Sequence, residues 1–335
     1  MTNFTIPTPS RQQTALTSRS TALKVIESTA ILFINLFALA GNAILYWAIR
    51  RNCRLRQNTT NLLISSLALG DILMAVLCMP FSIGVFILGR WMFGELACQL
   101  QGFAFFVLAF VSQETMALIA VNRYLNVTKP VVYRRIFTRK RSLRMIVFVW
   151  LVCVIYVSIF AILKWPVFVF DPGKTICHIS LTDHNFKNAW NTITMVVFSL
   201  TPMATLFVSY WRVLVCVRRH NTVALRSLRT GSLQRSAHAL EDIKISKIIL
   251  GLIAGYFCCW LPAYSISYVK LAYPAVSDQR FPQTLWAFLV FSSSAINSVI
   301  YGILNRTFRI EILKIVSCKR GVDGAVENNI TNRVL

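Results

Sequence analysis

Long apolar runs restrict what this 335-residue chain can fold into more than any other feature. A bilayer core about 30 Å thick is crossed by a helix of roughly 20 mostly apolar residues. Each run is apolar on all sides and does not alternate over ten residues, so we expect helices and not the strands of a barrel. Seven segments have the required length: 25–49, 60–87, 99–122, 143–165, 190–217, 246–270 and 284–304.

The composition agrees with a chain whose solvent is the membrane. Hydrophobic residues make up 56% of it and charged residues only 14%, whereas soluble domains carry about 25% charged residues. The sequence therefore predicts an all-α membrane protein, a seven-transmembrane helix bundle. Transporters are commonly built from paired halves, and the odd number of spans without a visible internal repeat counts against that class.

The formal net charge is +23, and the positions of the basic residues along the chain are more informative than their sum. If the N-terminus is outside, the cytoplasmic segments contain most of the lysines and arginines, as the positive-inside rule requires. We therefore expect a multi-pass protein of the plasma membrane with an extracellular N-terminus. The basic face would meet membrane lipids or a protein partner, and no nucleic acid. These cytoplasmic segments are 50–59, 123–142, 212–248 and 305–335.

The chain outside the spans divides by polarity. Asn3 in NFT is an N-glycosylation acceptor on the expected outer side. A short amphipathic stretch after the last span predicts an eighth helix on the inner membrane surface, and Cys318 after it is a candidate palmitoylation site. The expected regions are an extracellular tail (1–24, without a signal peptide), the bundle (25–304), the membrane-surface helix (305–317) and a cytoplasmic tail (318–335).

Polar side chains inside the spans are the first functional candidates. A charged group at mid-bilayer is costly and usually faces the bundle interior, and Asp71 in SLALGDILMA is the clearest case. Ser112, Ser293 and Asn297, with Asn42, also lie within spans and would surround one carboxylate and a sodium ion. The alternative is that these polar groups only join helices by hydrogen bonds.

The expected orientation indicates which cysteines can form a disulfide. Of nine cysteines, Cys98 and Cys177 fall at or beyond the outer surface, where the oxidising exterior favours a disulfide between them. No Cys/His spacing resembles a zinc site, and no nucleophile–base constellation appears. We therefore expect no enzymatic activity and no required cofactor.

With these landmarks the chain resembles a rhodopsin-like (class A) G-protein-coupled receptor from about residue 25 to 318. At least one motif of this family stands in each of the seven spans, in order and at the right spacings. The motifs are Gly41-Asn42; Leu67-Ala68-x-x-Asp71; Cys98 with Cys177; Asn122-Arg123-Tyr124; Trp150; Pro202 with Tyr210; and Cys259-Trp260-Leu261-Pro262 followed by Asn297-Ser298-Val299-Ile300-Tyr301.

The resemblance implies a role for each motif residue. Arg123 would contact a heterotrimeric G protein in the active state, and arrestin is a further candidate partner. Trp260 above the Pro262 kink would transmit ligand binding, because proline removes a helix hydrogen bond and lets the span bend. The expected activation switch comprises Asn122, Arg123, Tyr124, Tyr210, Trp260, Pro262, Asn297 and Tyr301, and the sodium site comprises Asp71, Ser112, Ser293 and Asn297.

Two departures from the family pattern point toward one branch. The family usually has an acidic residue before the arginine and proline after the span-seven asparagine, where this chain has Asn122 and Ser298. Both departures are similar to the melatonin-receptor branch and nearby orphan receptors. The amide side chains that melatonin receptors use correspond here to Phe160 and Leu181, so the ligand does not follow from the branch.

The expected ligand pocket is aromatic and neutral. The position that carries an aspartate in amine receptors is Phe105, and the 284–304 span has no Schiff-base lysine. A small neutral or indole-like ligand is favoured over a peptide, although Lys270 and Arg280 at the outer rim would suit an acidic peptide or a lipid headgroup. The pocket residues are Gln101, Phe105, Phe106, Ala109, Thr194, Trp260, Tyr264, Ser267 and Phe291.

The leading functional hypothesis is a receptor that binds an extracellular ligand and activates a G protein. The short third inner loop and the melatonin-like features favour the inhibitory Gi/o class. A peptide-binding class A receptor, a ligand-silent partner or scavenger on the same scaffold, and a seven-helix pump or transporter remain as alternatives.

Overall fold

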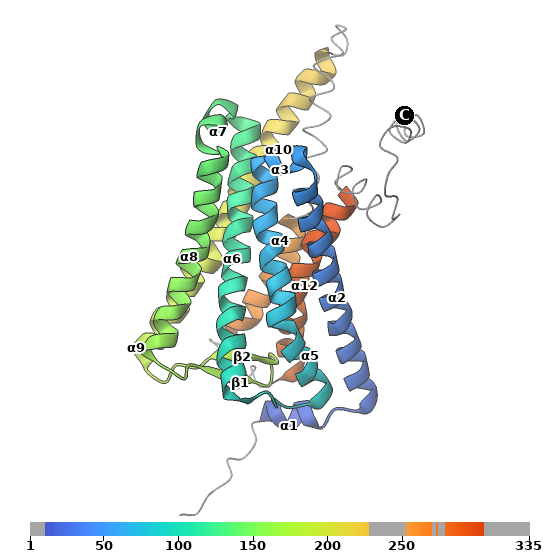
Figure 1. The fold of residues 1–335 in the computed structure, drawn as a ribbon, viewed down its shortest axis with the longest axis vertical. Helices are drawn as coiled ribbons and strands as arrows, with labels where there is room; N and C mark the ends of the chain where they lie inside the picture. The colour runs from blue at the N-terminus through green and yellow to red at the C-terminus, as the bar shows by residue number, and fades with distance from the viewer. Residues whose placement is uncertain (1–10, 228–250, 252, 270–272, 274–278, 305–335) are drawn as a thin grey trace, which may run out of the picture.

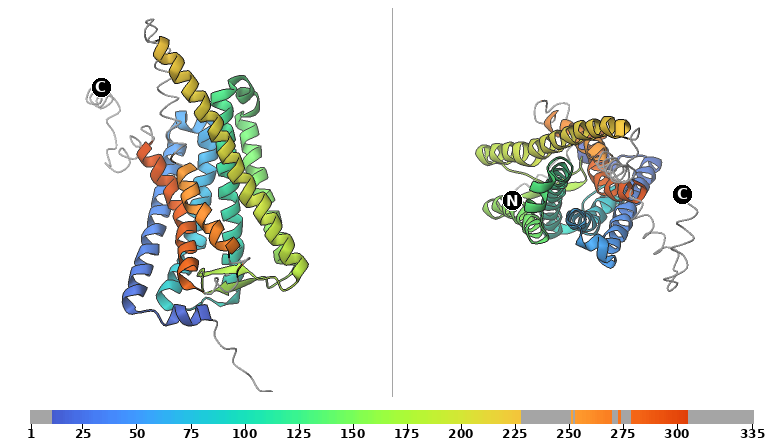
Figure 2. Two further views of the ribbon diagram at one scale, coloured as in Figure 1. Left: turned by 180° about the vertical axis from the view of Figure 1, so that it is seen from behind. Right: turned by 90° about the horizontal axis from the view of Figure 1, so that it is seen from above.

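A computed structural model describes residues 11–227, 251, 253–269, 273 and 279–304. Its helices run side by side along one long axis, and a small hairpin lies at one end (Figure 1). Residues 253–269 are helical and lie within the bundle in both views of Figure 2. The other long helices are α2 (Thr21–Arg51), α4 (Thr59–Leu77), α5 (Met79–Leu88), α6 (Gly94–Thr128), α8 (Arg139–Leu163), α10 (Thr201–Ser227) and α12 (Arg280–Leu304).

The seven-helix bundle expected from the sequence is confirmed. Six segments among the described residues are long and apolar enough to cross a membrane, and the helix over 253–269 supplies the seventh. Part of the expected 246–270 segment lies outside the described residues. α6 is the central helix, because 78% of the apolar stretch of α6 is buried inside the protein. The corresponding share for α8 is 22%.

Two spans are interrupted where proline removes a backbone donor. The 60–87 segment divides at Cys78 into α4 and α5, with Pro80 in the first turn of α5. The fifth span begins earlier than expected, as α9 (His184–Ile193), and passes through a π-helical turn, η1 (Thr194–Leu200), before Pro202 in α10. These breaks shift the helix faces that line the space between the spans.

Three short helices cap the ends of the bundle. α3 (Cys53–Gln57) and α7 (Pro130–Ile136) lie at one end, and α1 (Arg11–Thr17) lies at the other. The segment expected as an N-terminal tail (1–24) therefore contains helical structure within its described residues. α1 is folded with Leu16 buried, and α2 already starts at Thr21, where the side chain of Ser20 accepts a hydrogen bond from the Leu23 N–H.

A buried charge cluster attaches this N-terminal segment to the bundle. The Arg19 guanidinium donates to Glu27 at 2.6 Å and to the backbone carbonyl of Phe86 in α5 at 2.8 Å. Arg280 at the start of α12 also pairs with the Glu27 carboxylate. Arg280 is therefore committed to an internal ion pair, which argues against the expectation that it attracts an acidic ligand at the rim.

An antiparallel hairpin of β1 (Phe168–Asp171) and β2 (Ile176–Ile179) lies across the same end, with Phe170 opposite Cys177. The predicted disulfide joins Cys98 at the start of α6 to Cys177 in β2. The Gln99 side chain donates to the Phe168 carbonyl at 2.7 Å. A Cβ on Gly102 would stand 2.6 Å from the Phe168 ring, so this close approach requires glycine.

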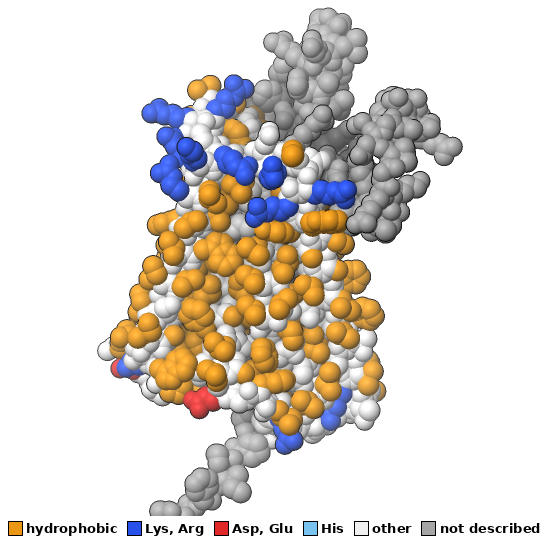
Figure 3. All heavy atoms as spheres, in the orientation of Figure 1, with side chains coloured by type: hydrophobic (Ala, Val, Ile, Leu, Met, Phe, Trp, Pro, Cys, Tyr) orange, Lys and Arg blue, Asp and Glu red, His pale blue; other side chains and the backbone are white. Residues whose placement is uncertain are grey.

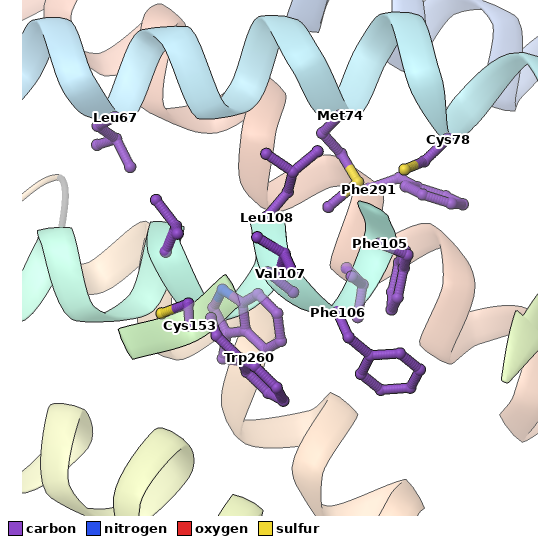
Figure 4. Packing of buried hydrophobic residues seen from close by; sticks show 14 of the residues in the cluster. Leu67, Met74, Cys78, Phe105, Phe106, Val107, Leu108, Cys153, Trp260 and Phe291 are labelled. Atoms are coloured by element: carbon purple, nitrogen blue, oxygen red, sulfur yellow. The ribbon is translucent and has the colours of Figure 1, made fainter. Parts of the chain in front are cut away.

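The interior is packed between α4, α6 and α12. Figure 4 shows Met74 and Cys78 on the α4 side, close to Phe291, and the residues from Phe105 to Leu108 on α6. Phe291 is fully buried, and its ring meets that of Phe105 edge-on at 6.0 Å. The core is therefore continuous from the middle of the bundle to the hairpin end.

The outer surface has the pattern of a membrane protein. A broad belt of exposed hydrophobic side chains surrounds the middle, and Lys and Arg gather in a band at the end that carries α3 and α7 (Figure 3). Exposed apolar residues of this kind, such as Phe148 at 68% and Phe207 at 61%, need a lipid environment. The opposite, hairpin end shows few basic residues in this view.

Candidate functional site

A cavity of about 730 Å³ opens at the hairpin end, between α6, α9, η1, α12 and the helix over 253–269. Its volume falls in the range of about 300–1,000 Å³ that is typical of small-molecule sites. Seven of the nine residues expected in the pocket line it. They are Phe105, Phe106, Ala109, Thr194, Trp260, Tyr264 and Ser267.

Aromatic rings form most of the cavity wall. Phe106 meets Trp190 of α9 edge-on at 5.3 Å and His178 of β2 at 5.1 Å. Trp260 packs against Tyr264 at 5.5 Å between ring centroids. Such a wall offers flat, weakly polar surfaces, which suit an aromatic ligand.

A polar cluster crosses the cavity between α6 and the sixth-span helix. The backbone carbonyl of Phe198, four residues before Pro202, belongs to the π-helical turn η1. The Tyr264 hydroxyl lies 3.3 Å from that carbonyl and also donates to Gln113 Oε1. One hydroxyl proton serves one acceptor at a time, so Tyr264 joins α6, the fifth span and the sixth span through exchangeable hydrogen bonds.

The hairpin places charged groups in the cavity roof. Lys174, in the turn between β1 and β2, is 5% exposed, and its Nζ lies 4.4 Å from the centroid of the Trp286 ring. Asp171 Oδ1 accepts the backbone N–H of Gly173 at 2.9 Å, which shapes the turn. Lys187 of α9 also lines the cavity, so the described part of the cavity wall contains two lysines and one aspartate.

Two expected pocket residues do not line the cavity. Gln101 is buried and accepts the Cys177 N–H at 2.8 Å, so its amide fixes the hairpin. Phe291 lies in the core behind Phe105. Gln113 was not among the expected pocket residues, although Phe106, Phe110 and Gln113 are spaced four and three residues apart on one helix face. Lys174 and Trp190 could not be found in this way, because the folded loop after α8 brings them to the cavity.

Asp71 is 1% exposed in the middle of α4, beside α12. The Asn297 amide donates to Asp71 Oδ2 at 3.0 Å. The Ser293 hydroxyl donates to the Val290 carbonyl of its own helix, while Ser294, one residue further, lies near the Asp71 carboxylate. Ser112 is buried on α6. Of the predicted sodium ligands, Asn297 therefore contacts the buried carboxylate directly, and Ser294 lies closer to it than was expected from the sequence.

The opposite, basic end contains the Asn122-Arg123-Tyr124 motif near the end of α6. Asn122 is fully buried, and its Oδ1 accepts a hydrogen bond from Thr60 Oγ1 of α4 at 2.8 Å. Tyr210 of α10 is partly buried. Pro262 lies within the helix over 253–269. Tyr301 lies in α12, and its side chain is outside the described part of the chain.

Several expectations concern residues outside the described part of the chain. They are the glycosylation acceptor Asn3, the rim residue Lys270, the membrane-surface helix 305–317, the tail 318–335 and the palmitoylation candidate Cys318.

A seven-helix membrane bundle, with a cavity at one end and a basic surface with an Arg-Tyr motif at the other, has the architecture of a transmembrane receptor. The model of the seven-transmembrane receptors of the rhodopsin family matches residues 41–301. The chain belongs to this family, whose members are receptors and not enzymes.

Relatives and a solved structure agree with this assignment. Galanin receptor 2b of Danio rerio is 26% identical over 92% of this chain and 80% of its own length. Melatonin receptor type 1B-B of Danio rerio is 27% identical over 88% and 82%, and Neuropeptide Y receptor type 6 of Oryctolagus cuniculus is 23% identical over 92% and 88%. The crystal structure of squid rhodopsin shares the fold, with a TM-score of 0.75 at 21% identity over 95% of this chain and 93% of that one.

Proposed function

We propose that this class A receptor binds its ligand in the hairpin-end cavity, from the extracellular side, and activates a heterotrimeric G protein at its basic end. The observation that carries the proposal is the polarity of the bundle. The aromatic cavity of about 730 Å³ and the Arg123 motif lie at opposite ends of α6. The basic band near α7 (Figure 3) supports a cytoplasmic location for the motif under the positive-inside rule.

The cavity supports a small aromatic ligand with hydrogen-bonding groups. Phe105, Phe106 and Trp260 offer apolar faces, and Gln113 and Tyr264 offer an acceptor and a donor. The melatonin-receptor relatives agree with an indole-sized ligand, but Phe160 in this chain is buried at 6% exposure and packs on Trp190. A ligand contact from an amide at this position is therefore missing, and the ligand differs chemically from melatonin.

A peptide is the second candidate ligand. Lys174 and Lys187 in the cavity wall would attract an acidic group, and the Neuropeptide Y receptor relative agrees with a peptide. The small aromatic ligand remains favoured because aromatic rings supply most of the wall, whereas only two lysines line it among the described residues.

A sodium ion fits the surroundings of Asp71. The carboxylate, hydroxyl and amide oxygens there are the hard ligands that such a cation prefers, and the buried Asn42 Oδ1 lacks a hydrogen-bond partner among the described residues. Asp71, Asn297 and Ser112, with Ser294, would hold the ion, whose positive charge would favour the inactive packing of α4 against α12.

A signalling assay tests the proposal. The chain is expressed with a panel of Gα subunits, and constitutive and library-evoked activation is measured, with the Gi/o class expected to respond. Arg123→Ala should abolish activation at unchanged surface expression, while Arg135→Ala on α7 serves as a basic control. Equal activity of wild type and Arg123→Ala in every channel would overturn G-protein signalling and favour the ligand-silent partner.

A further inference from the structure

A second groove, of about 450 Å³, lies on the outer face of the bundle near the basic end. Leu118 of α6, Ile136 of α7 and three residues of α8 form its apolar wall, and two arginines of α8 complete it. The α8 residues are Arg141, Arg144, Met145, Phe148 and Val149.

The helical spacing orders these groups along the membrane normal. Arg141, Arg144, Met145 and Phe148 follow one another at intervals of three, one and three residues, which places them on one face of α8. Arg141 and Phe148 are seven residues apart, which corresponds to about 10 Å along the helix. The groove therefore has its positive charge at the end of the bundle and its apolar wall toward the middle of the membrane.

The surrounding contacts fix this wall. Arg141 donates to the backbone carbonyl of Arg135, which ties the start of α8 to α7. Phe137, between the two helices, is 4% exposed and stacks on Tyr133, whose hydroxyl lies 2.8 Å from Thr59 Oγ1 of α4. α7 is thus held against the bundle, and the groove is part of the folded surface.

The groove faces the lipid phase. Phe148 is 68% exposed, and both arginines are exposed, although they stand directly beside an apolar wall. An exposed guanidinium at the edge of the hydrocarbon region is stabilised by an anionic headgroup, and it pairs well with phosphate. An acyl chain in the apolar part would remove the side chains of Met145 and Phe148 from contact with the polar headgroup layer.

We propose that this groove is a binding site for one anionic phospholipid of the leaflet at the basic end, with the headgroup on Arg141 and Arg144 and an acyl chain along Leu118, Met145 and Phe148. Because α6 carries Asn122-Arg123-Tyr124 one turn beyond Leu118, the bound lipid contacts the helix of the proposed activation switch. The leaflet is cytoplasmic if the proposed orientation holds, and the anionic lipids of that leaflet supply the ligand.

The site is tested by photolabelling of the purified full chain in nanodiscs. Two preparations of discs are made, both mainly of phosphatidylcholine. One contains a small fraction of phosphatidylserine with a diazirine on one acyl chain, and the other contains the same fraction of phosphatidylcholine with the same diazirine. Labelled peptides are mapped by mass spectrometry. Both leaflets of a disc have the same composition, so the result does not depend on orientation or on signalling.

In the wild type, the serine lipid should label the peptides around Leu118 and 145–149 more strongly than the choline lipid. Arg141→Gln and Arg144→Gln should each lower this labelling about fivefold, the attraction of one basic side chain near an anionic leaflet. The paired variant Arg134→Gln with Arg135→Gln is the control, because it removes the same charge from α7 outside the groove wall. Leu118→Trp, which fills the groove, should reduce labelling by both lipids there.

Equal labelling by the two lipids in the wild type would overturn the proposal, as would unchanged labelling in Arg141→Gln with Arg144→Gln. Thermal unfolding of each variant in the discs distinguishes lost binding from lost folding. If neither lipid labels the groove and added G protein slows hydrogen exchange over 136–149, the groove is a protein interface and the lipid site is wrong.

Discussion

At the scale of single residues, Asn122 replaces the carboxylate that most family members place before the arginine. It is buried and accepts a hydrogen bond from Thr60, so it restrains α6 against α4 without a charge. A carboxylate at the same position would pair with Arg123 and stabilise the inactive arrangement. We infer that basal signalling in this chain lacks a charge-based restraint.

Asn122→Asp should therefore lower basal signalling and make it pH-dependent. Acidification protonates the introduced carboxylate and removes its pairing with Arg123, so basal activity should rise as the pH falls. The measurement is basal Gα activation across a pH series at matched surface expression. Thr60→Val is the control, since it removes the hydrogen bond to Asn122 and adds no titrating group; equal basal activity of wild type and Asn122→Asp would place the restraint elsewhere.

Asp71 allows a second prediction at this scale. Sodium should raise the thermal unfolding temperature of the purified receptor above its value in a bulky organic cation at the same ionic strength, because the ion binds the folded state. Asp71→Asn should abolish the sodium-dependent increase. Ser294→Ala should weaken it more than Ser293→Ala, because Ser294 lies near the Asp71 carboxylate whereas the Ser293 hydroxyl donates to Val290; a full sodium effect in Asp71→Asn would contradict the assignment.

At the scale of elements, the Glu27 cluster joins the N-terminal segment, α2, α5 and α12. The side chains of Arg19 and Glu27 are 1% and 10% exposed. Since water does not solvate them, each charge is stabilised mainly by the opposite charge of its partner. α1 and the hairpin turn also meet at the cavity, which both Gln12 and Lys174 line. The N-terminal segment is therefore part of the wall that a ligand meets.

Glu27→Gln should destabilise the receptor strongly, because it leaves two arginines beside a neutral amide. Breaking a buried ion pair costs about 3–5 kcal/mol. The measurement is the thermal unfolding temperature in detergent, together with the rate of proteolysis before α2. Lys164→Gln is the matched control: its pair with Asp183 spans 4.0 Å with side chains 36% and 42% exposed, and an exposed pair contributes about 0–1 kcal/mol. A similar loss in both variants would argue against the cluster as a clamp.

At the scale of the whole molecule, orientation determines which end meets the ligand. The basic band at one end of the bundle (Figure 3) predicts that this end is cytoplasmic. The chain carries N-x-S/T acceptors on both expected sides, Asn3 in NFT and Asn305 in NRT. Only an acceptor that reaches the lumen during synthesis is modified, so these two positions report the orientation.

The receptor from mammalian cells should migrate faster after glycosidase treatment, and Asn3→Gln should already show the faster migration without treatment. Asn305→Gln is the matched control and should migrate like the wild type. Electrophoresis of the surface-labelled protein is the measurement. A glycosidase shift that disappears in Asn305→Gln and persists in Asn3→Gln would reverse the proposed orientation.

Local sequence patterns predicted the spans and seven of the residues that line the cavity. Phe105, Ala109 and Trp260 were accessible to this reasoning because helical periodicity and motif spacing place them on inward faces. Gln101 and Phe291 satisfy the same periodicity, yet one bonds to Cys177 and the other packs in the core. Periodicity gives the face of a helix, but it does not give the depth of a residue or the loop that covers it.

The sequence by itself determined that the chain crosses a membrane as seven helices, because the length and apolarity of a span are local properties set by the thickness of the bilayer. It also determined the disulfide partners through the expected orientation. The tertiary structure decided that Arg19 and Arg280 share Glu27, that Tyr264 reaches Gln113 and the Phe198 carbonyl, and that the hairpin brings Lys174 over the cavity. These contacts join residues that are far apart in the chain, and their partners follow from how the helices pack and where the loops fold back.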